Sequence, residues 1–137
     1  MSIRNLVYDA LRTDATLNGL GINAGTLYPN FTPDSPSADK LIFAVIRWGT
    51  ADAPPGRDTT ARTVAVTIWV YDRSRSFGNI EPILQRVRTV LRGLEGAAHT
   101  GGAVLGVTYD FSSEDLYDTD YDAVVRNETY SIAASGT

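Results

Sequence analysis

The chain has 137 residues, of which 43% are hydrophobic and 20% charged, which indicates one folded domain and excludes a disordered chain. Its formal net charge of −4 lacks the basic excess by which DNA-binding proteins neutralise phosphates. Cysteine is absent, which removes disulfides, thiolate metal sites and cysteine nucleophiles, and which suits folding in a reducing cytosol.

The sequence has no segment that is typical of membrane insertion or secretion. Its longest apolar run covers residues 41–46, whereas a spanning helix needs about 20 residues. The first residues form an amphipathic pattern without the apolar stretch of a signal peptide. We therefore expect a protein made and folded in the cytosol, with no membrane association.

Apolar residues at helical spacing predict a first helix that starts after Ser2 and weakens at residues 13–15. Leu17 and Leu20 are expected to lie in a short turn and to pack against the rest of the domain. A short strand over 26–28 follows, and a proline-rich exposed loop extends from Pro29 to residue 39.

Two long strands come next. Residues 41–48 are almost continuously apolar, which predicts a central strand. A long loop over 49–61 contains Pro54-Pro55-Gly56, and long loops inside compact domains are often functional. Residues 62–71 then alternate strictly, which predicts one face of valine and isoleucine against the helices and a second face of threonines and aromatics.

A second helix is predicted between Ser76 or Asn79, as its N-cap, and Gly93 or Gly96, as its end. Pro82 is expected in the first turn, where a missing N–H costs little. One apolar stripe runs along this helix, formed by Ile80, Ile83, Leu84, Val87, Val90, Leu91 and Leu94.

Two further strands, over 103–111 and 123–134, flank an acidic loop at 113–122. The order of these elements predicts an α+β fold in which a single antiparallel or mixed β-sheet carries two main α-helices packed on one face. There is no internal repeat and no boundary, so residues 1–137 form a single domain.

The acidic loop is the first candidate site, because Asp118, Asp120 and Asp122 have the alternating spacing that begins an EF-hand calcium loop. The remainder of that motif is absent. Ala123 stands where glycine is required, and Thr129 stands where a bidentate glutamate is required. We therefore predict no metal ion, and calcium titration should give no heat.

Catalytic patterns are also missing. His99, the only histidine, lies in a loop of small residues without an activated serine in its context. Gly101-Gly102 lacks the surroundings of a phosphate-binding fingerprint. Glu114 and Asp115 form a carboxylate pair but mark no pocket. The sequence predicts neither enzyme activity nor a cofactor.

Charged and aromatic residues around the predicted strand 62–71 are candidates for contacts with other molecules. Its flanking arginines either balance loop charge or meet the acidic loop of a neighbouring copy, since a heterologous ring interface joins unlike patches. Trp48, Trp69 and Tyr71 are more often core residues, although burial of the last two requires more protein or a partner on the second face.

The whole pattern resembles the small tail-terminator (tail-completion, or minor tail) proteins of long-tailed phages. The likeness rests on the order of weak pieces: Ile3-Arg4-Asn5-Leu6 with Ala10-Leu11-Arg12, Asp14-Ala15-Thr16-Leu17, Leu27-Tyr28-Pro29, Ile46-Arg47-Trp48-Gly49, Val64 to Tyr71, Ile83 to Leu91, and Val125-Arg126-Asn127-Glu128-Thr129-Tyr130.

This resemblance implies a structural virion protein, assembled in the host cytoplasm, that forms a ring of normally six copies at the head-proximal end of the tail. The ring would sit on the tail tube protein, stop tube polymerisation and offer its other face to a head-side connector protein. DNA would pass through the lumen without specific binding, and the family carries no catalytic residues. The residues assigned to the oligomer or tube interface are Arg57, Asp58, Arg62, Trp69, Tyr71, Arg73, Arg75, Glu114, Asp115, Asp118, Asp120 and Asp122.

Two other functions remain open. A head-to-tail connector, or another ring protein of the neck, shares this size and acidic charge. A small cytosolic protein-binding module that uses the face of Trp69 belongs to a different class.

Overall fold

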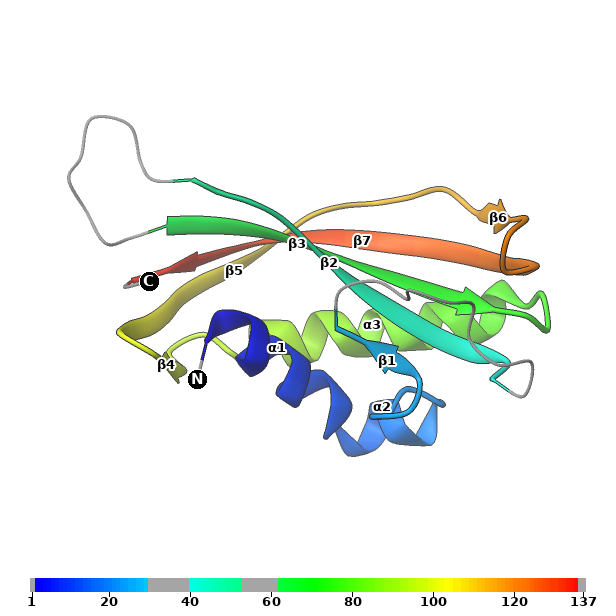
Figure 1. The fold of residues 1–137 in the computed structure, drawn as a ribbon, viewed down its shortest axis with the longest axis horizontal. Helices are drawn as coiled ribbons and strands as arrows, with labels where there is room; N and C mark the ends of the chain where they lie inside the picture. Colours follow the sequence, from blue (N-terminus) through cyan, green and yellow to red (C-terminus); the bar gives the residue numbers. More distant parts are fainter. Residues whose placement is uncertain (1, 30–39, 53–61, 136–137) are drawn as a thin grey trace.

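The computed structural model describes residues 2–29, 40–52 and 62–135, without the side chains of 50–52. One curled sheet lies above three helices in Figure 1. The helices and strands in the described residues are α1 (Ile3–Arg12), α2 (Ala15–Gly19), β1 (Leu27–Tyr28), β2 (Ile42–Asp52), β3 (Arg62–Asp72), α3 (Phe77–Arg92), β4 (Ala98–His99), β5 (Gly102–Ser112), β6 (Leu116–Asp118) and β7 (Ala123–Ala134).

The sheet is mixed, which is one of the two predicted alternatives. Its strand order is β1-β2-β3-β7-β5-β4, and the short β6 pairs with β7 beyond the end of β5. Only the β1–β2 pair is parallel among the described strands. Since the helices all lie on one side of the sheet (Figure 1), the architecture is the two-layer α+β fold expected from the sequence.

The main core lies between the sheet and the helices. Val66, Ile68 and Val70 of β3 are fully buried there, together with Val7 of α1 and Ile83 of α3. This confirms that the aliphatic face of the strictly alternating strand meets the helices. The predicted helical stripe is also confirmed, because five of its residues are buried in α3: Ile80, Ile83, Leu84, Val87 and Leu91.

A second, smaller cluster occupies part of the opposite sheet face. The Phe43 and Tyr71 rings are stacked, with centroids 4.7 Å apart, and Tyr121 meets both rings edge-on. Tyr71 is therefore only 2% exposed. The additional protein that burial of this tyrosine was expected to require comes from the chain itself, through Tyr121.

Three local predictions also need correction. The helix α3 begins at Phe77, so Pro82 lies in its second turn rather than its first. Ser76 occupies the N-cap position, as one of the two predicted alternatives, but its side chain makes no capping hydrogen bond. The turn before the helix is organised by Asp72, which accepts hydrogen bonds from the backbone and hydroxyl of Ser74 and from the Asn79 amide. The predicted acidic loop contains a strand, β6, and residues 49–52 extend β2.

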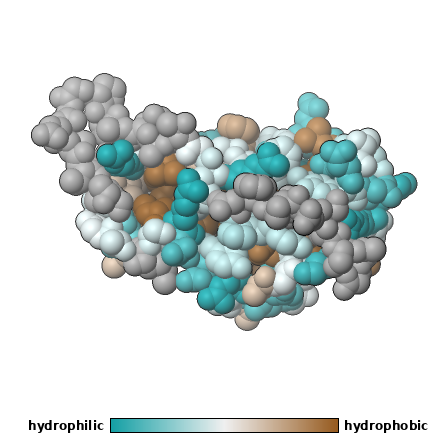
Figure 2. Space-filling model, in the orientation of Figure 1, coloured by the Kyte–Doolittle hydropathy of each residue, from teal (hydrophilic) through white to brown (hydrophobic). Residues whose placement is uncertain are grey.

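No helix in the described part of the chain is both long and apolar enough to cross a lipid bilayer. The face drawn in Figure 2 is mainly hydrophilic, and its hydrophobic side chains form small, separate areas.

Candidate functional site

The predicted charge pairing between arginines and the acidic segment occurs inside one chain for at least one pair. Arg75, in the turn before α3, donates to the Asp122 carboxylate at 2.7 Å, and the Tyr117 hydroxyl donates to the same oxygen. Both hydrogen bonds lower the pKa of Asp122, and the one from Tyr117 has the larger effect. Arg75 and Asp122, which were expected to pair between copies, form an ion pair within the chain. Their role in an interface stays a prediction.

Arg73 and Asp118 are likewise held by their own chain. The Arg73 guanidinium donates to the carbonyls of Tyr121, at 3.1 Å, and Lys40, at 3.2 Å. Asp118 accepts hydrogen bonds from the backbone N–H groups of Asp120 and Tyr121, at 2.9 and 3.0 Å. The alternating aspartates therefore shape a turn, and no group of residues suited to a metal ion occurs in the described ranges.

The proposed interface residues do not form one patch. Arg62 begins β3 and Arg73 follows its end, so a strand of this length separates them by about 33 Å. Trp69 is half-buried, with the Arg47 guanidinium carbon 5.4 Å from its ring centroid. Arg57 and Asp58 lie outside the described residues.

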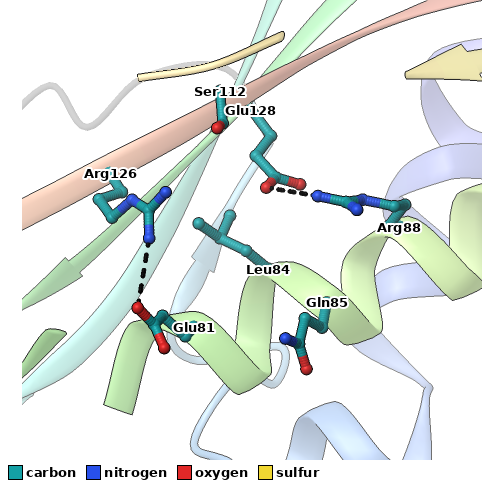
Figure 3. A pocket seen from close by; sticks show the side chains of 7 residues that line it. All are labelled: Glu81, Leu84, Gln85, Arg88, Ser112, Arg126 and Glu128. Atoms are coloured by element: carbon teal, nitrogen blue, oxygen red, sulfur yellow. Dashed lines mark hydrogen bonds and ion pairs between the residues drawn. The ribbon is translucent and has the colours of Figure 1, made fainter. Parts of the chain in front are cut away.

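A pocket of about 330 Å³ opens between α3 and the ends of β5 and β7 (Figure 3). Arg126 bridges its rim, with ion-pair distances of 3.6 Å to Glu81 and 3.5 Å to Asp115. Glu114, which precedes Asp115 in the sequence, is exposed. The lining is Glu81, Leu84, Gln85, Arg88, Ser112, Arg126 and Glu128.

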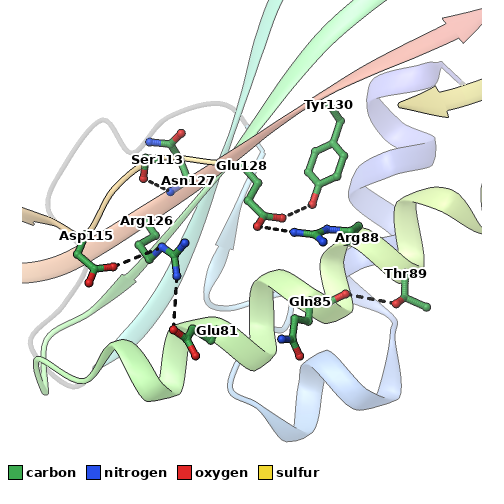
Figure 4. A network of polar contacts seen from close by, with 10 residues as sticks. All are labelled: Glu81, Gln85, Arg88, Thr89, Ser113, Asp115, Arg126, Asn127, Glu128 and Tyr130. Atoms are coloured by element: carbon green, nitrogen blue, oxygen red, sulfur yellow. Dashed lines mark hydrogen bonds and ion pairs between the residues drawn. The ribbon is translucent and has the colours of Figure 1, made fainter. Parts of the chain in front are cut away.

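Sequence reasoning missed the buried charge at the base of this pocket. Glu128 is only 4% exposed; it accepts hydrogen bonds from Arg88 at 2.9 Å and from the Tyr130 hydroxyl at 2.6 Å (Figure 4). The Arg88 guanidinium also lies 4.0 Å from the centroid of the Tyr109 ring. A signal was present, because Glu128 shares a strand face with Tyr130 and Ile132, which are both core residues.

The electrostatics of this network keep the Tyr130 hydroxyl protonated. Burial, and then the hydrogen bond to Glu128, raise the pKa of Tyr130 far above its usual range, so the phenol stays neutral and donates. Since both arginines of the pocket already face carboxylates, the pocket offers no uncompensated cationic cradle. His99 lies elsewhere, and the expectation of an exposed loop histidine is wrong, because His99 belongs to β4 and is buried.

Two carboxylates should make the free energy of unfolding depend on pH in the acidic range. Arg86 holds Asp14 at 2.8 Å and lowers its pKa below the usual 3.8; burial opposes this effect. The pKa of Asp72 is also lowered, because its hydrogen bonds from Ser74, Asn79 and Ser76 outweigh burial. A depressed folded-state pKa contributes stability that is present above the unfolded value and lost as pH falls through the folded one.

We therefore expect the urea midpoint of unfolding to stay constant down to about pH 5 and to fall as the pH drops below about 4. Asp14→Asn is a matched control, because asparagine keeps the N-cap of α2 and cannot titrate. This variant should lose less stability between these pH values than the parent chain. Equal losses would show that the Asp14–Arg86 pair contributes nothing to the acid response.

Comparison with known proteins identifies a similar fold. No protein-family model and no curated protein matches the sequence. A chain of the solved virion of a native gene transfer agent particle superposes with a TM-score of 0.73, over 98% of this chain and 96% of that one. The two chains are 18% identical. At this identity the likeness shows a shared fold across nearly the full length of both chains.

Proposed function

We propose that this chain is a structural subunit of a phage-like virion and that it forms a ring, normally of six copies, at the head-proximal end of the tail. The observation that carries this proposal is the shared fold with a virion chain over nearly all of both sequences. The order of sequence segments described above resembles tail terminators and supports the same assignment.

In this role the ring caps the tail tube protein on one face, ends tube polymerisation and binds a head-side connector protein on the other face. The net charge of −4 per chain suits a conduit that lets DNA pass without gripping it. The role requires neither catalysis nor a cofactor. The predicted interface residues remain candidates for these contacts, with the exposed Glu114 and Asp120 available on the surface.

The experiment is deletion of the gene from the phage or phage-like element that encodes it, followed by negative-stain electron microscopy of the lysate. Tails that are overlong and headless are expected. Tails of normal length beside full, unjoined heads would instead assign the chain to the head-to-tail connector. Normal infectious particles would contradict a structural role and leave the protein-binding module, with the Trp69 face as the surface to test.

A further inference from the structure

Both edges of the sheet are largely open in the described part of the chain. At one edge, β1 covers only Ala44 and Val45 of β2. At the other edge, β4 covers only Gly102 and Ala103 of β5. The outer backbone of residues 46–52 thus has no strand partner among the described residues. On β5, Val104 exchanges backbone hydrogen bonds with Gly96 and Ala97, and the Val107 N–H donates to the Glu95 carboxylate, so the open stretch is that of residues 108–112. Such edges are templates for pairing with another chain.

The two open stretches lie at the same level along the strands, on opposite edges of the sheet. Following the register across β3 and β7 leads from Ile46 to Ser112, and from Trp48 to Tyr109. The four long strands also alternate in direction, since each of their three pairings is antiparallel. In copies related by rotation about a ring axis, β5 of one copy would therefore run antiparallel to β2 of the next.

Two large hydrophobic side chains of the edge strand β5 are exposed. Every large hydrophobic residue that is exposed in the described ranges lies on β5 or β6, or immediately before β2. Leu105 and Phe111 are each 60% exposed, an unusual state for side chains of this size. The full set is Leu41, Leu105, Phe111, Leu116 and Tyr117.

The edges also carry complementary charges. Residues 93–125 contain seven carboxylates and no lysine or arginine. In β5, Asp110 accepts a hydrogen bond from the Ser131 hydroxyl at 2.6 Å and has no cationic partner among the described residues. In β2, Arg47 is exposed over Trp69 and has no carboxylate partner in the same ranges.

Arg47 and Asp110 lie on the same face of the sheet and at the same level along its strands. Arg47 aligns with Thr67, Thr129 and then Phe111 across the sheet, and residues aligned in this way point to one face. Ser131 follows Thr129 by two residues in β7, so it lies on that same face and brings the Asp110 carboxylate with it.

We propose that copies of this chain join edge to edge, with the open part of β5 pairing antiparallel to the open part of β2 in the next copy, and with Asp110 of one copy contacting Arg47 of the other. This inference deepens the proposed ring and rests on it. The pairing is heterologous, so it repeats around a ring and leaves no free edge once the ring closes.

A charge swap in the particle tests the contact. Arg47→Glu and Asp110→Arg each place like charges opposite each other, so each variant should lower the number of copies of the chain in purified particles about tenfold. The double variant restores opposite charges and should recover incorporation to within about twofold of the parent chain. Thermal unfolding of the purified variants checks that they fold. Normal incorporation of both single variants, or no recovery in the double variant, would overturn the contact.

A cross-link provides a second readout. Within one copy, Arg47 and Asp110 lie on opposite edges of four strands, about 14 Å apart, which is beyond the reach of a disulfide. The chain has no native cysteine, so the disulfides of an Arg47→Cys/Asp110→Cys variant must join copies, and a ladder of multimers is expected from oxidised particles. Dimers from either single-cysteine variant would indicate a symmetric pairing and contradict the head-to-tail arrangement.

The two proposals fail in different ways. Normal infectious particles after gene deletion would remove the structural role itself. Defective particles after deletion, together with normal incorporation of the charge variants and no cross-linked ladder, would remove only the edge pairing.

Discussion

Replacing Glu128 by alanine should lower the free energy of unfolding by about 2–4 kcal/mol. The change removes the acceptor of the Tyr130 hydroxyl, and this tyrosine is fully buried. It also removes the carboxylate that Arg88 faces at 2.9 Å. The Arg88 side chain is 36% exposed, so its guanidinium can be hydrated in the variant. Most of the loss in the free energy of unfolding should therefore come from the unpaired Tyr130 hydroxyl and from the cavity.

Urea denaturation of the purified chain measures this effect, and Asp115→Ala is the matched control. Asp115 faces an arginine of the same pocket at 3.5 Å, but its side chain is 61% exposed, and exposed ion pairs contribute little. Combining Glu128→Ala with Tyr130→Phe should recover part of the loss, because no hydroxyl is then left unpaired. A loss below about 1 kcal/mol for Glu128→Ala would show that water reaches the Tyr130 hydroxyl and replaces the carboxylate.

The sequence predicted best the features that depend on local periodicity. The alternation in β3 identified the strand and the face that meets the helices, because a period of two residues in burial has one structural cause. The apolar stripe of α3 did the same for the longest described helix. The start of that helix was less predictable, since it depends on Asp72, a residue of the preceding strand whose side chain turns back to bind Ser74 and Asn79.

Side-chain partners distant in sequence could not be predicted. Arg75 and Asp122 are 47 residues apart, and composition alone fits a contact within a copy as well as one between copies. Glu128 and Arg88 are 40 residues apart, on a strand and a helix whose relative rotation is not encoded by either pattern. The open edges became visible only when the register across β2, β3, β7 and β5 was known.

Phe43→Ala should produce the largest loss of stability, about 3–5 kcal/mol. Phe43 is fully buried on the sheet face away from the helices. Besides its contacts with Tyr71 and Tyr121, it meets the Tyr28 ring edge-on, with centroids 6.3 Å apart. Loss of this ring leaves a cavity between aromatic side chains that come from separate strands and a turn, so the neighbours cannot all collapse into it.

Phe111→Ala is a matched control, because it deletes the same side chain from a site that is 60% exposed. In the purified single chain it should change the unfolding midpoint little, whereas the proposed edge pairing makes it costly in the assembled particle. The two phenylalanines thus separate folding from assembly. A loss below about 1 kcal/mol for Phe43→Ala would mean that the chain does not seal this face by itself, and Tyr71 would return as a residue that a partner covers.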